Sequence, residues 1–268
     1  MIKRIIILFA ALIISGLIYS CSTVPITGRS QLDLIPDNEM LSMSFQQYDQ
    51  FLKDNKESTN KQQIALVKKV GKRVADAVEK YFSEHNLSNQ LQGYKWEFHL
   101  IESKEANAWC MPGGKVVVYT GILPITKTES GLAVVLGHEI AHAVAKHGNE
   151  RMSQGLLTQL GGMALSEAIK NKPDLTQNIF MAAFGIGAQV GILLPYSRLQ
   201  ESEADHLGLI FMAMAGYDPH EALDFWQRMT TMQKGQSPPE FLSDHPSNES
   251  RIEKIKEEMP EAMKYYHK

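Results

Sequence analysis

Cysteine is scarce in this chain, and neither sign of charge dominates it. The 268 residues include two cysteines, Cys21 and Cys110, so at most one disulfide could form. Twenty-seven Lys and Arg residues oppose thirty Asp and Glu residues, for a formal net charge of -3. The basic residues do not gather into a stripe. We therefore expect no binding of nucleic acid, which requires a basic surface.

Long hydrophobic runs and internal repeats are also missing. The apolar run at residues 5–18 has 14 residues, and the one at residues 181–194 has the same length. A helix that crosses a bilayer needs about 20 apolar residues, so the second run predicts a core helix. The total length suffices for one sizeable domain or two small ones.

The N-terminus has the pattern of a targeting segment. Lys3 and Arg4 precede the apolar run, and Ile18-Tyr19-Ser20-Cys21 follows it. This resembles a bacterial lipobox, although Tyr19 is bulkier than usual. We predict a lipoprotein signal peptide at 1–20, acylation of Cys21 and a tether at 21–36. An ordinary secretory signal or an uncleaved anchor is the alternative.

Acylation of Cys21 has two consequences. The chain would be anchored by lipid in the cell envelope, and we expect it at the outer membrane, facing the periplasm. Cys110 would then be a free thiol, which excludes an intramolecular disulfide. A lone cysteine can be a nucleophile, but a small buried side chain is the more common role, and we expect it here.

The most informative motif is His138-Glu139-Ile140-Ala141-His142. On a helix, positions i and i+4 share a face, so the two imidazoles can hold one zinc ion while Glu139 reaches a water on it. The surrounding run, residues 132–145, is apolar, which predicts a buried helix rather than an amphipathic one with two incidental histidines. Thr126 with Glu129 predicts the start of this helix, and Gly148 predicts its end.

A third ligand is expected from a separate helix at residues 197–208. Glu201 and Asp205 lie four residues apart, so Glu201 can bind the metal while Asp205 reaches back to a ligand histidine. Glu203 should point away and bind no metal. A solvated charged face is the alternative for this pattern alone.

The remaining patterns predict an α+β fold that is mainly α-helical. Helices are expected at 37–52 and 64–81, and further helices at 152–169 and 177–194. Residues 96–101 read as a strand, and Pro112-Gly113-Gly114 as the turn of a hairpin. Its second strand leads into the metal helix. If the edge of that strand is free, a substrate peptide could pair with it, unless a loop covers the edge. The proposed substrate strand comprises Lys115, Val116, Val117, Val118 and Tyr119.

Further motifs make the resemblance specific. They are Asn107-Ala108 before Pro112-Gly-Gly, Ser197-Arg198, and residues 244–252, Asp-His-Pro-Ser-Asn-Glu-Ser-Arg-Ile. With the H-E-x-x-H motif they resemble gluzincin peptidases of the HtpX and CAAX prenyl protease family. They more closely resemble its soluble bacterial lipoprotein branch and the catalytic domain of the mitochondrial overlapping-activity protease. The resemblance covers residues 37–259, but the long transmembrane helices of HtpX are absent.

The resemblance implies a zincin-like metallopeptidase domain, assigned to residues 37–268, with one zinc ion per chain. It also implies roles for two residues near the C-terminus. His245 would stabilise the oxyanion or occupy the open position of the metal as a latch, and Arg251 would brace the site through an ion pair. From the residues alone, His245 beside Pro246 would be a turn residue.

The expected function is zinc-dependent hydrolysis of peptide bonds, with Glu139 as general base. The substrates would be polypeptides, in particular misfolded or misassembled envelope proteins. One alternative is a latent or non-proteolytic chaperone or assembly factor on the same fold. Another is a deformylase-like hydrolase, which would use a cysteine such as Cys110 as a metal ligand.

Overall fold

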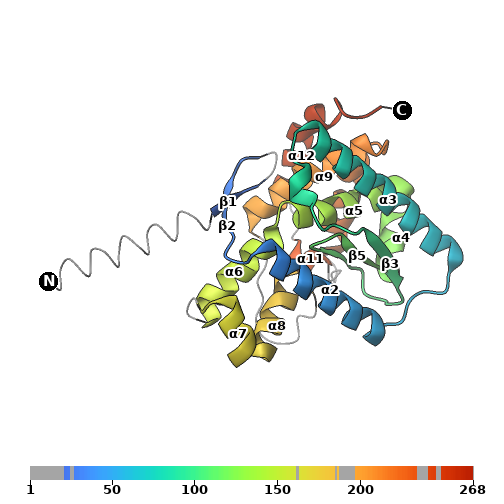
Figure 1. Cartoon of the computed structure of the whole chain (residues 1–268). Helices are drawn as coiled ribbons and strands as arrows, with labels where there is room; N and C mark the ends of the chain where they lie inside the picture. The colour runs from blue at the N-terminus through green and yellow to red at the C-terminus, as the bar shows by residue number, and fades with distance from the viewer. Residues whose placement is uncertain are drawn as a thin grey trace.

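The computed structural model describes residues 21–24, 27–160, 163–184, 186, 197–233, 241–245 and 249–267. The expected signal peptide and the second half of the apolar run at 181–194 lie outside these residues. Within them, helices dominate and two small sheets are present (Figure 1). The predicted class, α+β and mainly α, is confirmed.

Two long helices open the domain. Helix α2 spans Asp37–Asp54, and α3 spans Lys61–Glu84. The Asn60 side chain begins α3 by accepting hydrogen bonds from the first free backbone N–H groups of that helix. One apolar face of α3 is buried, and the short 3-10 helix η1, Ser88–Leu91, follows it. Both predicted helices are confirmed.

The larger sheet has three strands in the order β3-β5-β4. Strand β3 spans Glu97–Ile101, β4 spans Ala108–Met111 and β5 spans Lys115–Tyr119. Gly113 and Gly114, both at positive φ, form the turn between β4 and β5. Strand β5 pairs in parallel with β3 and antiparallel with β4. The expectation that Lys115 to Tyr119 offer a free edge to substrate is therefore wrong, since both edges are occupied.

The metal helix is α5, Glu129–Val144, and it follows η2, Thr120–Ile122, and the short α4, Leu123–Thr126. Its N-cap is Thr128, whose side chain accepts from Gly131 N at 2.9 Å, so the predicted cap at Thr126 is wrong by two residues. The predicted end at Gly148 is also wrong. The chain leaves α5 through Lys146 at φ 59, and Gly148 lies inside the next helix.

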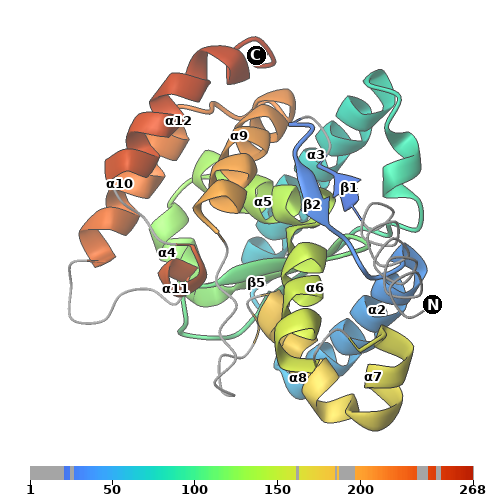
Figure 2. The ribbon, with the colours of Figure 1, turned by 90° about the vertical axis from the view of Figure 1, so that its left-hand side faces the viewer.

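The described part of the second half of the chain is largely helical, as predicted, but the boundaries differ. Residues 152–169 and 177–194 were expected as two helices, whereas three shorter helices cover the described part. The helices are α6 His147–Leu160, α7 Leu165–Asn171, α8 Pro173–Ala183, α9 Arg198–Met214, α10 Glu221–Gln233, α11 Phe241–Asp244 and α12 Glu249–Ala262. Figure 2 shows α9, α10 and α12 stacked on one side of α5, with α6 to α8 on the other. None of the helices in the described part combines the length and apolar character needed to cross a bilayer.

The segment predicted as a tether, residues 21–36, contains two short strands. Strands β1, Cys21–Thr23, and β2, Ser30–Leu32, form an antiparallel hairpin. Val24 is buried against the main core, and the Gln31 side chain donates a hydrogen bond to Ala145 O at 3.0 Å. The described part of this segment is therefore packed against the domain at the end of α5.

Helices α5 and α9 cross in backbone contact. A Cβ on Gly137 would lie 2.9 Å from Gly208 O, and a Cβ on Gly208 would lie 3.0 Å from the backbone of Gly137 and His138. Only glycine at both positions permits this approach. The crossing places the side chains that follow Gly137 on α5 beside those that precede Gly208 on α9.

Candidate metal centre

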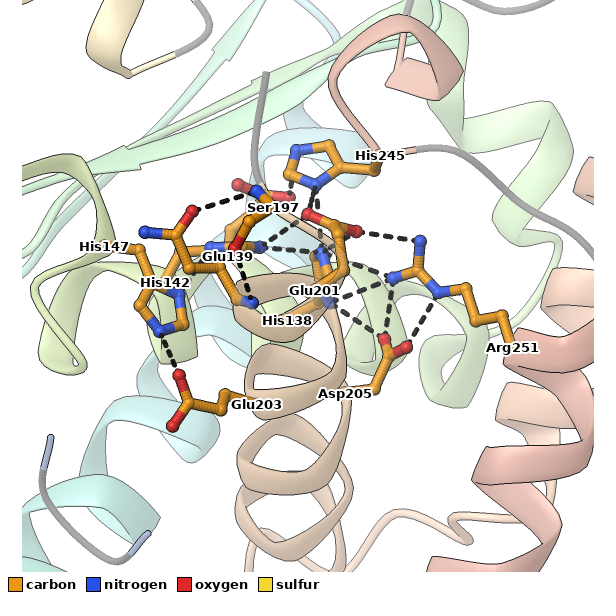
Figure 3. Close-up of polar contacts among 11 residues, drawn as sticks. His138, Glu139, His142, His147, Ser197, Glu201, Glu203, Asp205, His245 and Arg251 are labelled. Carbon is orange, nitrogen blue, oxygen red and sulfur yellow. Dashed lines mark hydrogen bonds and ion pairs between the residues drawn. The ribbon is translucent and has the colours of Figure 1, made fainter. Parts of the chain in front are cut away.

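Four potential ligands meet at the crossing of α5 and α9. His138 and His142 come from α5, Glu201 comes from α9, and His245 follows α11 (Figure 3). One ligand atom from each lies within 4.8 Å of the others, and all four residues are buried. The predicted set of His138, His142 and Glu201 is therefore brought together, with His245 as a fourth member.

The spacing fits one small metal ion. Tetrahedral ligands about 2.0–2.1 Å from a zinc ion lie roughly 3.3 Å from one another. His142 Nε2 lies 3.1 Å from His138 Nε2 and 3.2 Å from Glu201 Oε1. His245 Nδ1 lies 3.1 Å from His138 Nε2 and 2.9 Å from Glu201 Oε1. The donor set, three imidazole nitrogens and one carboxylate, is also of the type that zinc prefers.

The outward-facing nitrogens explain why a cation is needed. His138 Nδ1 lies 3.0 Å from Asp205 Oδ1, and His142 Nδ1 lies 2.8 Å from His147 Nδ1. If each Nδ1 donates its proton outward, both Nε2 atoms present lone pairs to one another. Burial is the main cause that lowers the pKa of both rings, which favours their neutral form. Two lone pairs 3.1 Å apart are stable only with a cation between them.

Arg251 braces the acidic residues, as predicted. Its Nε and Nη2 atoms donate to the two oxygens of Asp205 at 2.7 Å each, and Nη1 lies 2.8 Å from Glu201 Oε2. The guanidinium also stacks on Trp226, 3.4 Å from the ring centroid. Burial opposes ionisation of Asp205 and Glu201. Arg251 and the neighbouring histidines outweigh it and hold the pKa of both carboxyls below the ordinary value.

Glu139 lies beside the cluster without belonging to it. Its side chain is buried, and its Oε1 atom lies 3.5 Å from His245 Nε2. This position suits a general base, because the carboxylate adjoins the ligands yet is not one of them. His245 therefore directs its Nδ1 atom towards the other ligands and its Nε2 atom towards Glu139.

Glu203 is not a metal ligand, but it has contacts that the sequence did not predict. Glu203 is outside the ligand cluster, as expected, but it is buried and does not face solvent. Its Oε2 atom lies 3.3 Å from His147 Nε2 and 2.6 Å from Arg29 Nε. Neither partner was singled out from the sequence. His147, five residues after His142 in an apolar stretch, was a signal that could have identified one of them.

The deformylase-like alternative is excluded by the ligand set. Cys110 lies on β4 and is buried, and the cluster in the described part of the chain contains no cysteine. Burial, and secondarily the charge of Glu139, raises the pKa of the Cys110 thiol well above its usual value. A thiol held in this state is a poor nucleophile. The side chain of Cys21 lies outside the described part, so its acylation stays a prediction.

Two histidines on one helix, a glutamate from a second helix and an acidic residue beside them that is not a ligand define a metallopeptidase centre. The sequence matches Peptidase family M48 over residues 68–259. The chain belongs to this family.

Characterised relatives are found in mitochondria and in bacteria. The chain is 40% identical over 174 residues to the mitochondrial metalloendopeptidase OMA1 of Schizosaccharomyces pombe, covering 64% of this chain and 49% of that protein. It is 31% identical over 250 residues to the mitochondrial metalloendopeptidase OMA1 of Saccharomyces cerevisiae, covering 90% of this chain and 70% of that protein. It is 30% identical over 162 residues to the beta-barrel assembly-enhancing protease of Yersinia pestis, covering 59% and 33%. The chain thus spans about half of the S. pombe protein and a third of the Yersinia protein.

Proposed function

We propose that this protein is a zinc-dependent endopeptidase, anchored by lipid in the cell envelope, that degrades misfolded or misassembled envelope proteins. One observation carries the enzymatic part. His138, His142 and Glu201 converge from two helices on a site beside Glu139, at the spacing of zinc ligands. Membership of Peptidase family M48 supports the same conclusion.

The residues of the site suit hydrolysis of a peptide bond. His138, His142 and Glu201 would hold the zinc ion, which when bound polarises a carbonyl and lowers the pKa of water towards neutrality. Glu139 would accept the proton of the attacking water and deliver it to the leaving amine. Asp205 fixes the tautomer of His138 through its Nδ1 atom.

The fourth ligand supports a latent state. A catalytic zinc site keeps one position open for water, whereas four protein ligands describe a closed site. His245 Nδ1 completes the set here, and His245 Nε2 faces the general base. His245 would therefore have to leave before a substrate could bind. On release it could donate to the developing oxyanion, which is worth a few kcal/mol when the geometry is right.

This closed set also favours the second candidate, a chaperone or assembly factor that stays non-proteolytic. The two candidates differ in one measurable respect. A latent protease gains activity when His245 is removed, and a non-proteolytic factor does not.

The substrate would pair with β4, because β5 is internal. Asn107 O accepts from Tyr119 N, so alternate residues of β4 direct their backbone groups towards β5. Ala108 and Cys110 fall between them, with their backbone groups directed to the edge of β4 that pairs with no strand in the described part of the chain; Ala108 N donates to Asn107 Oδ1 there. An extended peptide could add there as a fourth strand. Phe241 N bonds to Ala106 O, so α11 and the following His245 lie at the end of that edge.

The location and substrate class rest on the N-terminal sequence and on one relative. The pattern before Cys21 predicts acylation, and the Yersinia relative is named for the assembly of β-barrels. The mitochondrial relatives share the peptidase domain. Radiolabelled palmitate should enter the full chain and not Cys21→Ser, and the labelled protein should fractionate with outer membranes. Labelling of the variant at the parent level would refute the anchor.

The enzymatic proposal is tested with casein and three variants of the full chain. Glu139→Gln should retain one zinc ion per chain by mass spectrometry and cleave no casein. His245→Ala should retain zinc and cleave faster than the parent, with cleavage blocked by 1,10-phenanthroline. His220→Ala is the control, since His220 is exposed and its side chain pairs with Asp218 at the surface. It should match the parent.

Two results would overturn these assignments. Normal cleavage by Glu139→Gln would refute the general base. Absence of cleavage by a zinc-loaded His245→Ala, with both casein and unfolded outer-membrane protein as substrates, would favour the non-proteolytic factor.

A further inference from the structure

We propose that the N-terminal hairpin is part of the metal centre, because Arg29 positions Glu203, Glu203 positions His147, and His147 positions the ligand His142. The proposal rests on the metal centre of the proposed function. It assigns positioning roles to three residues that do not touch the metal, and it makes metal affinity depend on the segment that follows Cys21.

The contacts form an unbroken path from the hairpin to the ligand. Arg29 lies between β1 and β2, and its Nε atom donates to Glu203 Oε2 at 2.6 Å. Glu203 Oε2 lies 3.3 Å from His147 Nε2. His147 Nδ1 lies 2.8 Å from His142 Nδ1, and His142 Nε2 faces the other ligands. Figure 3 shows Glu203 and His147 on the side of His142 that is remote from His245.

The presence of a metal ion gives this path a direction. A metal on His142 Nε2 leaves the proton of that ring on Nδ1, so His142 must donate to His147 Nδ1. His147 then carries its own proton on Nε2 and donates it to Glu203. Metal binding therefore fixes the position of the proton on both rings, at His142 Nδ1 and His147 Nε2. A carboxylate at its end fixes both rings and increases the basicity of the ligand nitrogen.

Glu203 is the acceptor at the end of the path. Arg29 and His147 both face its Oε2 atom, with Arg29 Nε at 2.6 Å and His147 Nε2 at 3.3 Å. Thr27 Oγ1 donates to the other oxygen of Glu203 at 2.6 Å. Two of these three donors, Thr27 and Arg29, belong to the hairpin. Without the hairpin, Glu203 would keep, of its partners among the described residues, the contact with His147.

Arg29 also connects the hairpin to the helix that carries His147. Its Nη1 and Nη2 atoms donate to the two oxygens of Glu150 on α6 at 3.0 and 2.9 Å. Gln200 on α9 donates to Glu150 as well, at 2.7 Å. A single guanidinium therefore joins α6, through Glu150, to α9, through Glu203. Lysine cannot reproduce this, because one ammonium cannot present a planar fork to two carboxylates.

The hairpin is fixed independently of Arg29, so the path can be cut without detaching it. Gln31 bonds to Ala145 O, Leu34 N bonds to Ser153 Oγ at 3.0 Å, and Val24 is buried. Arg29→Gln should therefore fold and keep β1 and β2 in place. A change in the zinc affinity of Arg29→Gln would then result from interruption of the path and not from detachment of the hairpin.

The test measures zinc affinity of the full chain by competition with a chelator. Loss of an outer partner of a ligand histidine typically costs 10-fold to 100-fold in affinity. We expect a loss in this range for Glu203→Gln and about 10-fold for Arg29→Gln. Arg29→Lys should recover only part of the loss. The double variant should bind zinc no more weakly than Glu203→Gln alone, because both changes interrupt one path.

The control is Lys69→Gln, which removes an ion pair between α3 and Glu129 at the start of the metal helix. It should leave zinc affinity unchanged. A second readout separates positioning from general stability. The visible spectrum of the Co²⁺-loaded protein should shift in Glu203→Gln and Arg29→Gln, and should be unchanged in Lys69→Gln.

The outcomes distinguish this proposal from the metal centre itself. A parent chain that binds no zinc refutes the metal centre. A parent that binds zinc, together with Glu203→Gln at parent affinity and with the parent spectrum, refutes the positioning path. Additive losses in the double variant would refute a single path through Glu203.

Discussion

The contact between Gly137 and Gly208 gives the sharpest test of how the fold builds the site. Gly208→Ala adds a Cβ 3.0 Å from the backbone of Gly137 and His138. Ordinary contact begins at 3.4 Å, so the two helices must separate by about 0.4 Å. The obstacle is backbone on both sides, and no side chain can rotate out of the way.

The expected cost follows from two opposing terms. Alanine is favoured over glycine in a helix by about 0.5–1 kcal/mol. Overpacking of a close contact costs about 1–3 kcal/mol. The apoprotein should therefore lose about 1 kcal/mol of unfolding free energy. Zinc affinity should also fall, by about 10-fold, because a separation of about 0.4 Å uses most of the roughly 0.5 Å within which ligand atoms must keep their geometry.

The assay compares unfolding of the apoprotein in urea with zinc affinity in a chelator competition. Gly71→Ala is the matched control. Its Cβ would meet the Phe98 ring on β3, away from the metal centre, so stability should fall while affinity stays unchanged. If Gly208→Ala kept the affinity of the parent, the helix crossing would not be what sets the ligand geometry.

Three further predictions concern the surroundings of the site. Ser197→Ala removes the capping box of α9, and should cost about 1 kcal/mol in urea unfolding. Arg251→Met leaves two buried carboxylates without their guanidinium, and should cost about 3–5 kcal/mol in the zinc-free protein, also in urea. Burial raises the pKa of Glu258 from 4.5 to about 7, so it weakens folding progressively as pH rises from about 4.5 to 7. Glu258→Gln should raise the melting temperature above that of the parent at pH 8, and by less at pH 5. The matching change at the exposed neighbour, Glu257→Gln, should leave the melting temperature unchanged at both pH values.

Local patterns predicted the centre because its residues are close in sequence on each helix. His138 and His142 share one face of α5, and Glu201 and Asp205 share one face of α9. The pairing of these two faces could be inferred from chemistry, since two imidazoles and a carboxylate together bind zinc. The structure adds the reason that they meet, which is the absence of side chains at Gly137 and Gly208.

Other features could not be predicted, because they depend on long-range contacts. The turn at Pro112-Gly113-Gly114 predicts a strand at residues 115–119 but does not identify its neighbours, so the central position of β5 was missed. Arg29 and Glu203 are 174 residues apart, and nothing in the sequence around either one indicates the other. Thr126 and Thr128 both fit the start of α5, and only the turn through Lys127 at φ 63 selects Thr128.

The charge balance of the buried centre gives independent support for a dication. Glu139, Glu201 and Asp205 are buried carboxylates, and Arg251 is the guanidinium that neutralises one of them. Burial favours the neutral form of His138 and His142. The buried carboxylates therefore outnumber the guanidinium in an interior where a buried charge is very costly. A dication such as zinc reduces that excess. Arg29 lies on the far side of His147, where Glu150 and Glu203 are its partners.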